Sequence, residues 1–143
     1  MQASRRPLQE AGIGVDPALI IHAPHTHEGA YCHTTALLDG DTQPPTAIFN
    51  VSLIAASGTI RALSQRGMRV PEDVSVVALY DDQFADVLQP SVTTVRMPLQ
   101  AMGAASVDVL LDLLAGQAPS TGLILPPGDL IARASSGPAK AAR

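Results

Sequence analysis

The sequence predicts an α/β fold built around a parallel sheet. The run from Val74 to Leu79 is apolar except for Ser75, which is typical of a strand buried on both faces of such a sheet. The segment before it repeats apolar residues at spacings of three and four, as one face of a helix does. These positions are Leu53, Ala56, Ile60 and Leu63. Strands and helices that alternate in this way indicate right-handed βαβ units.

The elements can be placed in order along the chain. They are a helix ending near Gly12, a strand at Leu19–Ile21, a helix from Glu28 to Gly40, a strand at Ala47–Phe49, a helix from Leu53 to Gly67, a strand at Val74–Leu79, a strand at Val92–Val95, a helix from Pro98 to Gly116, and short strands at Leu123–Leu125 and Leu130–Ala134.

Each boundary carries a local signal. Glycine is the usual C-terminal stop of a helix and closes the four predicted helices. Asp16 and Pro17 turn the chain into the apolar run at 19–21, which reads as a buried strand. Ser52 can cap the helix that follows it by accepting a free backbone N–H. Pro98 suits the first turn of a helix, where its missing N–H costs nothing.

Charge and composition exclude several classes of protein. The 143 residues carry a formal net charge of −4, whereas a nucleic-acid surface shows clustered lysine and arginine. Cys32 is the only cysteine, so no internal disulfide can form and nothing indicates an oxidising compartment. No stretch approaches the roughly 18 consecutive apolar residues of a membrane span. We therefore expect a cytoplasmic protein with no membrane contact.

The residue inventory disfavours an enzyme. The single lysine, Lys140, lies in a small-residue tail, whereas phosphate loops, Schiff bases and receiver-type phosphotransfer need a lysine inside the fold. Ser57-Gly58 lacks the first glycine of a nucleophile elbow. A small α/β enzyme using Asp81 or Asp82 as acid and base is the remaining catalytic alternative.

Three loops are candidates for binding a small molecule. In open parallel sheets, ligands lie outside the carboxyl ends of the strands, which here are followed by residues 23–27, 50–52 and 80–83. Asn50 and Ser52 can hydrogen-bond polar ligands, and a buried Asp81 could accept two hydroxyl hydrogen bonds, as sugar recognition requires. The alternative for Asp81 is a solvated acidic turn, and the alternative for Ser52 is a plain helix cap.

Four histidines lie near the first of these loops: His22, His25, His27 and His33. No acidic or thiol partner has metal-motif spacing around them, so we expect neither a metal nor another cofactor. Surface exposure is the simpler interpretation, and a ligand-loop role for His25 and His27 is the alternative to it.

The segment from Pro45 to Pro98, with its strand, helix, strand and acidic loop, resembles the lactose-repressor/galactose-repressor family of transcription regulators. The resemblance covers most of the chain and implies a type I periplasmic-binding-protein-like subdomain that is incomplete. An ungapped match puts Tyr80, not Asp81, at the family's ligand-binding aspartate. Ser52 stands where many members carry an asparagine that holds ligand hydroxyls. Either the loop shifts by one residue, or Tyr80 has taken over the contact.

The resemblance also implies a division of the chain and a set of partners. Residues 1–95 would form the carboxyl-terminal sensing subdomain, 96–127 a helix and strand of the other subdomain, 128–135 a final strand and 136–143 a flexible tail. The family's DNA-reading headpiece is absent, so DNA would be bound only through a headpiece outside these residues. The helix at 99–113 would lose its usual cover.

The implied function is effector sensing by part of a repressor, without catalysis. The effector would be a sugar-like small molecule. Members of the family pair through this subdomain, so we expect a homodimer formed by the helix after Ser52 and the segment near Phe84 and Leu88. A stand-alone binding or dimerisation module is the alternative.

Overall fold

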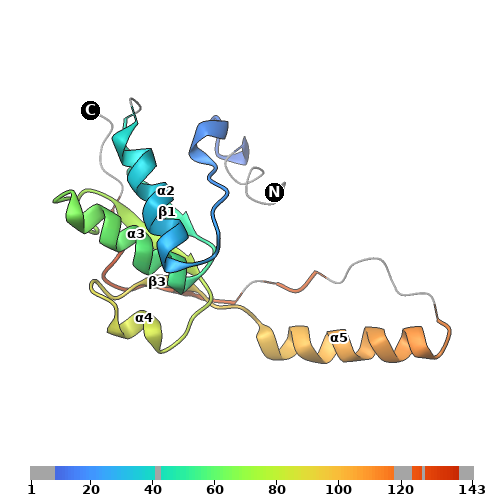
Figure 1. Ribbon diagram of the computed structural model, residues 1–143. Coiled ribbons are helices and arrows are strands. Elements are labelled where there is room, and N and C mark those ends of the chain that lie inside the picture. The colour runs from blue at the N-terminus through green and yellow to red at the C-terminus, as the bar shows by residue number, and fades with distance from the viewer. Residues whose placement is uncertain (1–8, 41–42, 118–123, 127, 139–143) are drawn as a thin grey trace.

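The computed structural model describes residues 9–40, 43–117, 124–126 and 128–138. Their elements are η1 (Pro17–Leu19), α2 (His27–Asp39), β1 (Ala47–Asn50), α3 (Leu53–Gln65), β2 (Ser75–Leu79), α4 (Phe84–Val87), β3 (Thr93–Val95), α5 (Leu99–Leu114) and β4 (Leu130–Ile131). The fold is α/β, as the sequence predicts (Figure 1).

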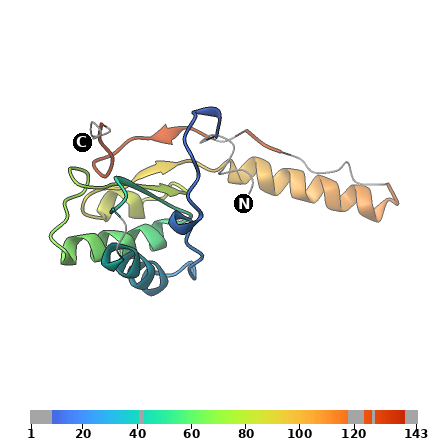
Figure 2. The same ribbon diagram turned by 90° about the horizontal axis from the view of Figure 1, so that it is seen from above.

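The sheet has four strands in the order β1-β2-β3-β4. The first three are parallel, with Asn50 opposite Ala78 and Leu79 opposite Val95, so their carboxyl ends meet at one edge. The fourth strand is antiparallel and pairs Val95 with Leu130. It reverses direction because the chain returns to the sheet from beyond α5 (Figure 2).

The helices α2 and α3 cover one side of the sheet (Figure 2). α3 packs on β1 and β2, and α2 packs on α3. The buried core consists of Leu53, Ala56, Ile60, Leu63, Val74, Val76, Ala78, Ala85 and Val92. The predicted apolar stripe of α3 is therefore confirmed as the core face. Gly58 permits the close approach of α2, because a Cβ atom there would collide with the carbonyl oxygen of His27.

Local capping sets the helix boundaries. Ser52 Oγ accepts a hydrogen bond from the Ala55 N–H at 3.2 Å, which confirms the predicted cap. α3 ends at Gln65, and Gly67 follows with a φ of 67°, a conformation that favours glycine. α2 begins one residue earlier than expected, because Thr26 caps it by accepting from the Gly29 N–H at 3.0 Å.

The predicted strand at Leu19–Ile21 is wrong. Residues 17–19 form a single 3₁₀ turn, and Leu19 and Ile21 are exposed. Asp16 caps this turn by accepting from the Ala18 N–H at 2.9 Å, and Pro17 lies at its first position. Local capping prevails over the apolar run here because no described strand pairs with the segment, and β1 is the outer strand of the described sheet.

The two strands expected near the end of the chain are also revised. Residue 123 lies outside the described residues, and 124–125 form no strand. The strand expected at Leu130–Ala134 is confined to β4, because the Arg133 N–H bonds to the side-chain hydroxyl of Thr93 instead of continuing the backbone ladder. The segment still returns to the sheet beyond β4, where the buried Ser135 accepts from the Val76 N–H through its carbonyl at 2.8 Å.

α5 projects away from the rest of the molecule (Figures 1 and 2). None of its residues is buried, although seven of them are exposed large hydrophobics. These are Leu99, Met102, Val107, Leu110, Leu111, Leu113 and Leu114. The uncovered face expected for this helix is therefore present. Together with the returning segment at Leu125 and Pro126, α5 lines an open groove of about 560 Å³.

Candidate functional site

The carboxyl edge of the parallel strands gathers the candidate binding residues. β1 and β2 are neighbours, and the chain leaves them at Asn50, two residues before Ser52, and at Leu79, directly before Tyr80. Together these two loops line a hollow of about 390 Å³. Its lining residues are Ser52, Leu53, Ile54, Tyr80, Asp82 and Phe84. The hollow thus combines apolar walls with a few polar groups, as small-molecule sites do.

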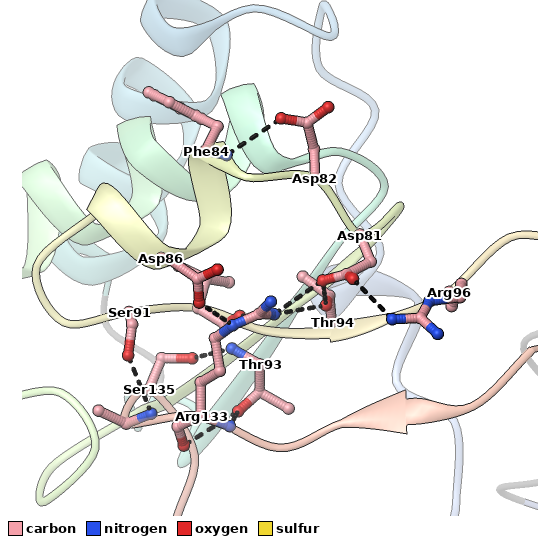
Figure 3. A network of polar contacts seen from close by, with 12 residues as sticks. Asp81, Asp82, Phe84, Asp86, Ser91, Thr93, Thr94, Arg96, Arg133 and Ser135 are labelled. Carbon is pink, nitrogen blue, oxygen red and sulfur yellow. Dashed lines mark hydrogen bonds and ion pairs between the residues drawn. The ribbon is translucent and has the colours of Figure 1, made fainter.

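Asp81 follows Tyr80 in the chain, and both of its carboxylate oxygens have partners in the protein (Figure 3). Its Oδ1 accepts a hydrogen bond from Thr94 Oγ1 at 2.6 Å and lies 2.8 Å from Arg133 Nη1. Its Oδ2 lies 3.3 Å from Arg96 Nη2. The Asp81 side chain is only 13% exposed, so the solvated acidic turn considered from the sequence does not describe it.

These contacts determine the protonation of Asp81. The hydrogen bond from Thr94 lowers the pKa of Asp81 below the ordinary value of 3.8, and Arg133 and Arg96 lower it further. Partial burial acts in the opposite direction and is outweighed. The carboxylate is therefore ionised throughout the neutral range.

Arg133 is the residue of this site that sequence reasoning missed. Its side chain is 12% exposed and lies between two carboxylates, with its Nε 2.6 Å from Asp86 Oδ1 (Figure 3). It also donates to the carbonyl oxygen of Val92 at 3.0 Å. Burial lowers the pKa of Arg133, but the bonds to Asp81 and Asp86 outweigh it, so the net shift is upward. A lone arginine in the apolar run 130–134 was the available signal.

Tyr80 has an unusual backbone. Its φ is 73°, and it is the only non-glycine residue with a positive φ among the described residues. Bulky residues rarely adopt this left-handed conformation. The few that do are concentrated at functional sites. Its N–H donates to the Val95 carbonyl at 3.0 Å, which ties the loop to β3. Its side chain is 40% exposed and lines the hollow.

Asn50 is buried and does not line the hollow. Its Oδ1 accepts from Thr59 Oγ1 at 2.9 Å, and Thr59 in turn contacts Thr34 Oγ1 at 3.2 Å. Its Nδ2 has no hydrogen-bond partner in the described part of the chain. The network joins β1 to α3 and α2, and an effector contact by Asn50 stays a prediction.

The histidines lie apart from the hollow. His27 Nδ1 is 2.8 Å from Ser57 Oγ, whose own hydroxyl donates to the Ile54 carbonyl, so the imidazole N–H donates to Ser57. His27 therefore links the start of α2 to α3, and His25 is exposed. Ligand contacts by both histidines stay predictions. No group of three or more His, Cys, Asp or Glu among the described residues could hold a metal ion.

The parallel sheet, the helices on one side of it and the hollow at the strand ends define a class of small-molecule-binding α/β domains. The chain belongs to the periplasmic binding protein-like domain family, whose sequence profile matches residues 1–136. No helix within the described residues is long and apolar enough to cross a membrane.

The similar proteins are transcription regulators. The chain is 38% identical over 130 residues to the HTH-type transcriptional regulator MalR of Streptomyces coelicolor, covering 90% of this chain and 37% of MalR. The regulator CelR in complex with cellobiose superimposes with a TM-score of 0.81 at 30% identity, covering 94% of this chain and 41% of CelR.

A LacI family regulator from Arthrobacter sp. FB24 in complex with lactose superimposes with a TM-score of 0.73 at 28% identity. The match covers 95% of this chain and 50% of that regulator. The chain thus spans half or less of the length of these three relatives. The resemblance to the LacI family found in the segment 45–98 is confirmed.

Proposed function

We propose that this chain senses a small-molecule effector for a transcriptional repressor, and that the effector is a sugar. The supporting observation is the hollow at the carboxyl ends of β1 and β2, lined by Ser52, Tyr80 and Asp82 between apolar side chains. Solved structures of similar regulators include complexes with cellobiose and with lactose, which supports a sugar as the class of ligand. Ligand-biased closure between two states would then carry the signal.

The proposed function is non-catalytic. A general acid or base works best when its pKa lies near the operating pH. The contacts of Asp81 lower its pKa, which moves it further from neutral pH. Its oxygens are also already bonded to Thr94, Arg133 and Arg96. Asp82 accepts a hydrogen bond from the Phe84 N–H at 3.0 Å, as a loop-forming carboxylate does.

The proposed assembly is a cytoplasmic homodimer. Val87 on α4 is 70% exposed and does not line the hollow, which supports pairing through the α4 face. The uncovered face of α5 supports assigning residues 96–127 to a second subdomain and residues 1–95, with the strand at 128–135, to the sensing subdomain. DNA would be contacted through a helix-turn-helix headpiece outside these residues, because the chain itself is acidic.

Titration of the ¹⁵N-labelled chain with cellobiose and with lactose tests the proposed function. The hollow is open to solvent, so it encloses a ligand only in part and we expect dissociation constants of about 1 mM. Chemical shifts should move at Ser52 and at residues 80–84 and stay constant on α2. If the shifts move only elsewhere, or not at all with either sugar, sugar sensing at this site is wrong.

A further inference from the structure

Two neighbouring residues compete for one role in the acidic loop. The resemblance leaves open whether Tyr80 or Asp81 contacts the effector. The Asp81 Oδ1 has two short contacts within the protein, with Thr94 on β3 and with Arg133 after β4, and its Oδ2 has a longer one with the exposed Arg96. A ligand hydroxyl at Oδ1 would have to displace Thr94 or Arg133 from a largely buried carboxylate, leaving Arg133 with Asp86 as its remaining ion-pair partner. Such an exchange is costly, because breaking a largely buried ion pair loses more than a ligand hydroxyl restores.

Tyr80 has the opposite character. Its side chain lines the hollow beside Ser52 and Asp82, and no hydrogen bond reaches its hydroxyl from the described residues. Its φ of 73° points to an external constraint, since a tyrosine does not choose this conformation freely. The constraint is visible on both sides, because the Tyr80 N–H is bonded to β3 and the next side chain is held by Arg133.

We propose that Arg133 and Thr94 fix Asp81 as the anchor of the acidic loop, and that Tyr80 is the residue with which this loop contacts the effector. Arg133 is then a positioning residue, since it acts on the site through Asp81. The anchor is independent of any ligand. The Tyr80 contact rests on the proposed function and names the residue that sets its specificity.

The exchange of a carboxylate for a phenol changes what the hollow can recognise. A carboxylate accepts hydrogen bonds from two ligand hydroxyls, whereas Tyr80 offers one hydroxyl and an aromatic face. Phe84, Leu53 and Ile54 extend the apolar wall beside it. The geometry suits a sugar that lays the C–H face of its ring on the aromatic side chain and hydrogen-bonds through a single hydroxyl.

The anchor is tested without ligand by following the Asp81 carboxyl carbon during a pH titration by ¹³C NMR. In the native chain its pKa should lie below 3.8, and both Arg133→Lys and Thr94→Val should raise it. Thr94→Val keeps the shape of the side chain, so it remains informative if Arg133→Lys fails to fold. Arg66→Lys is the matched control, because Arg66 pairs with Asp39 and should leave the Asp81 titration unchanged. An ordinary Asp81 pKa in the native chain would overturn the anchor.

The Tyr80 contact is tested with cellobiose and lactose as probes, using the same NMR titration. Tyr80→Phe removes only the hydroxyl and should weaken binding about fivefold without changing the Asp81 pKa. Tyr80→Asp should alter which sugar binds more tightly. Unchanged affinity in both variants, with sugar-dependent shifts at the Asp81 carboxyl, would overturn the assignment. If neither sugar moves any resonance, the sugar proposal fails together with the Tyr80 contact, while the anchor is still decided by the Asp81 titration.

Discussion

α3 and α5 are both apolar helices of similar length in one chain, yet their surroundings differ completely. Eight of the thirteen residues of α3 are buried between the sheet and α2. None of the sixteen residues of α5 is buried. An apolar stripe therefore predicts that a helix has a face to cover, but the rest of the chain determines whether the cover is present. The apolar residues of α3 therefore stabilise this fold by burial, whereas those of α5 are exposed and contribute little to it.

The largest expected difference between the two helices comes from removing a leucine side chain. Leu63 is fully buried, so Leu63→Ala should lower the free energy of unfolding by about 2 to 5 kcal/mol through lost burial and a residual cavity. Leu110 is 55% exposed, so Leu110→Ala should change it by less than about 0.5 kcal/mol. Urea denaturation followed by circular dichroism measures both. Equal losses would mean that α5 is covered in solution.

A matched glycine pair should give a smaller effect with opposite signs. Gly58→Ala places a methyl group against the backbone of α2 and should destabilise the fold by about 1 to 3 kcal/mol. Gly103 on α5 has open space around it, so Gly103→Ala should stabilise the protein by about 0.4 to 1 kcal/mol. Thermal unfolding of the two variants decides this. A stabilising Gly58→Ala would refute the close contact between α2 and α3.

Two surface substitutions distinguish the proposed dimer face from α5. Val87 is 70% exposed beside Phe84, and Val87→Glu should weaken the dimer about thirtyfold, the scale of one interface hot spot. Leu110→Glu should weaken it less. Sedimentation velocity over a range of protein concentrations measures both. A stronger effect from Leu110→Glu would place the dimer contact on α5.

The pH dependence of stability should show the smallest effect. Because the pKa of Asp81 is lowered in the folded state, its contribution is fully present above the unfolded pKa and is lost as the pH falls through the folded value. Urea midpoints measured between about pH 6 and about pH 3 should therefore fall more steeply for the native chain than for Asp81→Asn. Identical slopes would show that Asp81 gains no proton-linked stabilisation on folding.

Local patterns in the sequence predicted most of the α/β framework. The stripe on α3, the Ser52 cap and the glycine after α3 all depend on residues a few positions apart, so they can be read directly. The segment at 19–21 was misread because an apolar triplet becomes a strand only when a neighbouring strand pairs with it. Which strands pair depends on the tertiary fold, so it cannot be predicted from a short stretch of sequence.

The candidate site was predicted less completely than the fold. The loops after β1 and β2 were identified, because parallel strands must end at a common edge. The tie between Asp81 and Arg133 joins residues far apart in the chain, and no spacing rule connects them. The sequence also left the choice between Tyr80 and Asp81 open, because it does not show which of two adjacent side chains faces the hollow. The orientations of the two side chains depend on the hydrogen bond from Thr94 to Asp81 and on that from the Tyr80 N–H to Val95, which only the folded chain reveals.

The return of residues 128–136 to the sheet also has a consequence for biosynthesis. The ribosome synthesises β2, the acidic loop and β3 well before this segment, so some hydrogen-bonding groups of the nascent sheet are at first unpaired. The N–H groups of Val76 and Thr93 find their acceptors only when Ser135 arrives, and Asp81 meets its main counter-ion only with Arg133. The sheet is therefore completed only after residues 128–136 have been synthesised, well after its central strands. A stop codon before Arg133 should leave an unfinished sheet exposed to cellular proteases.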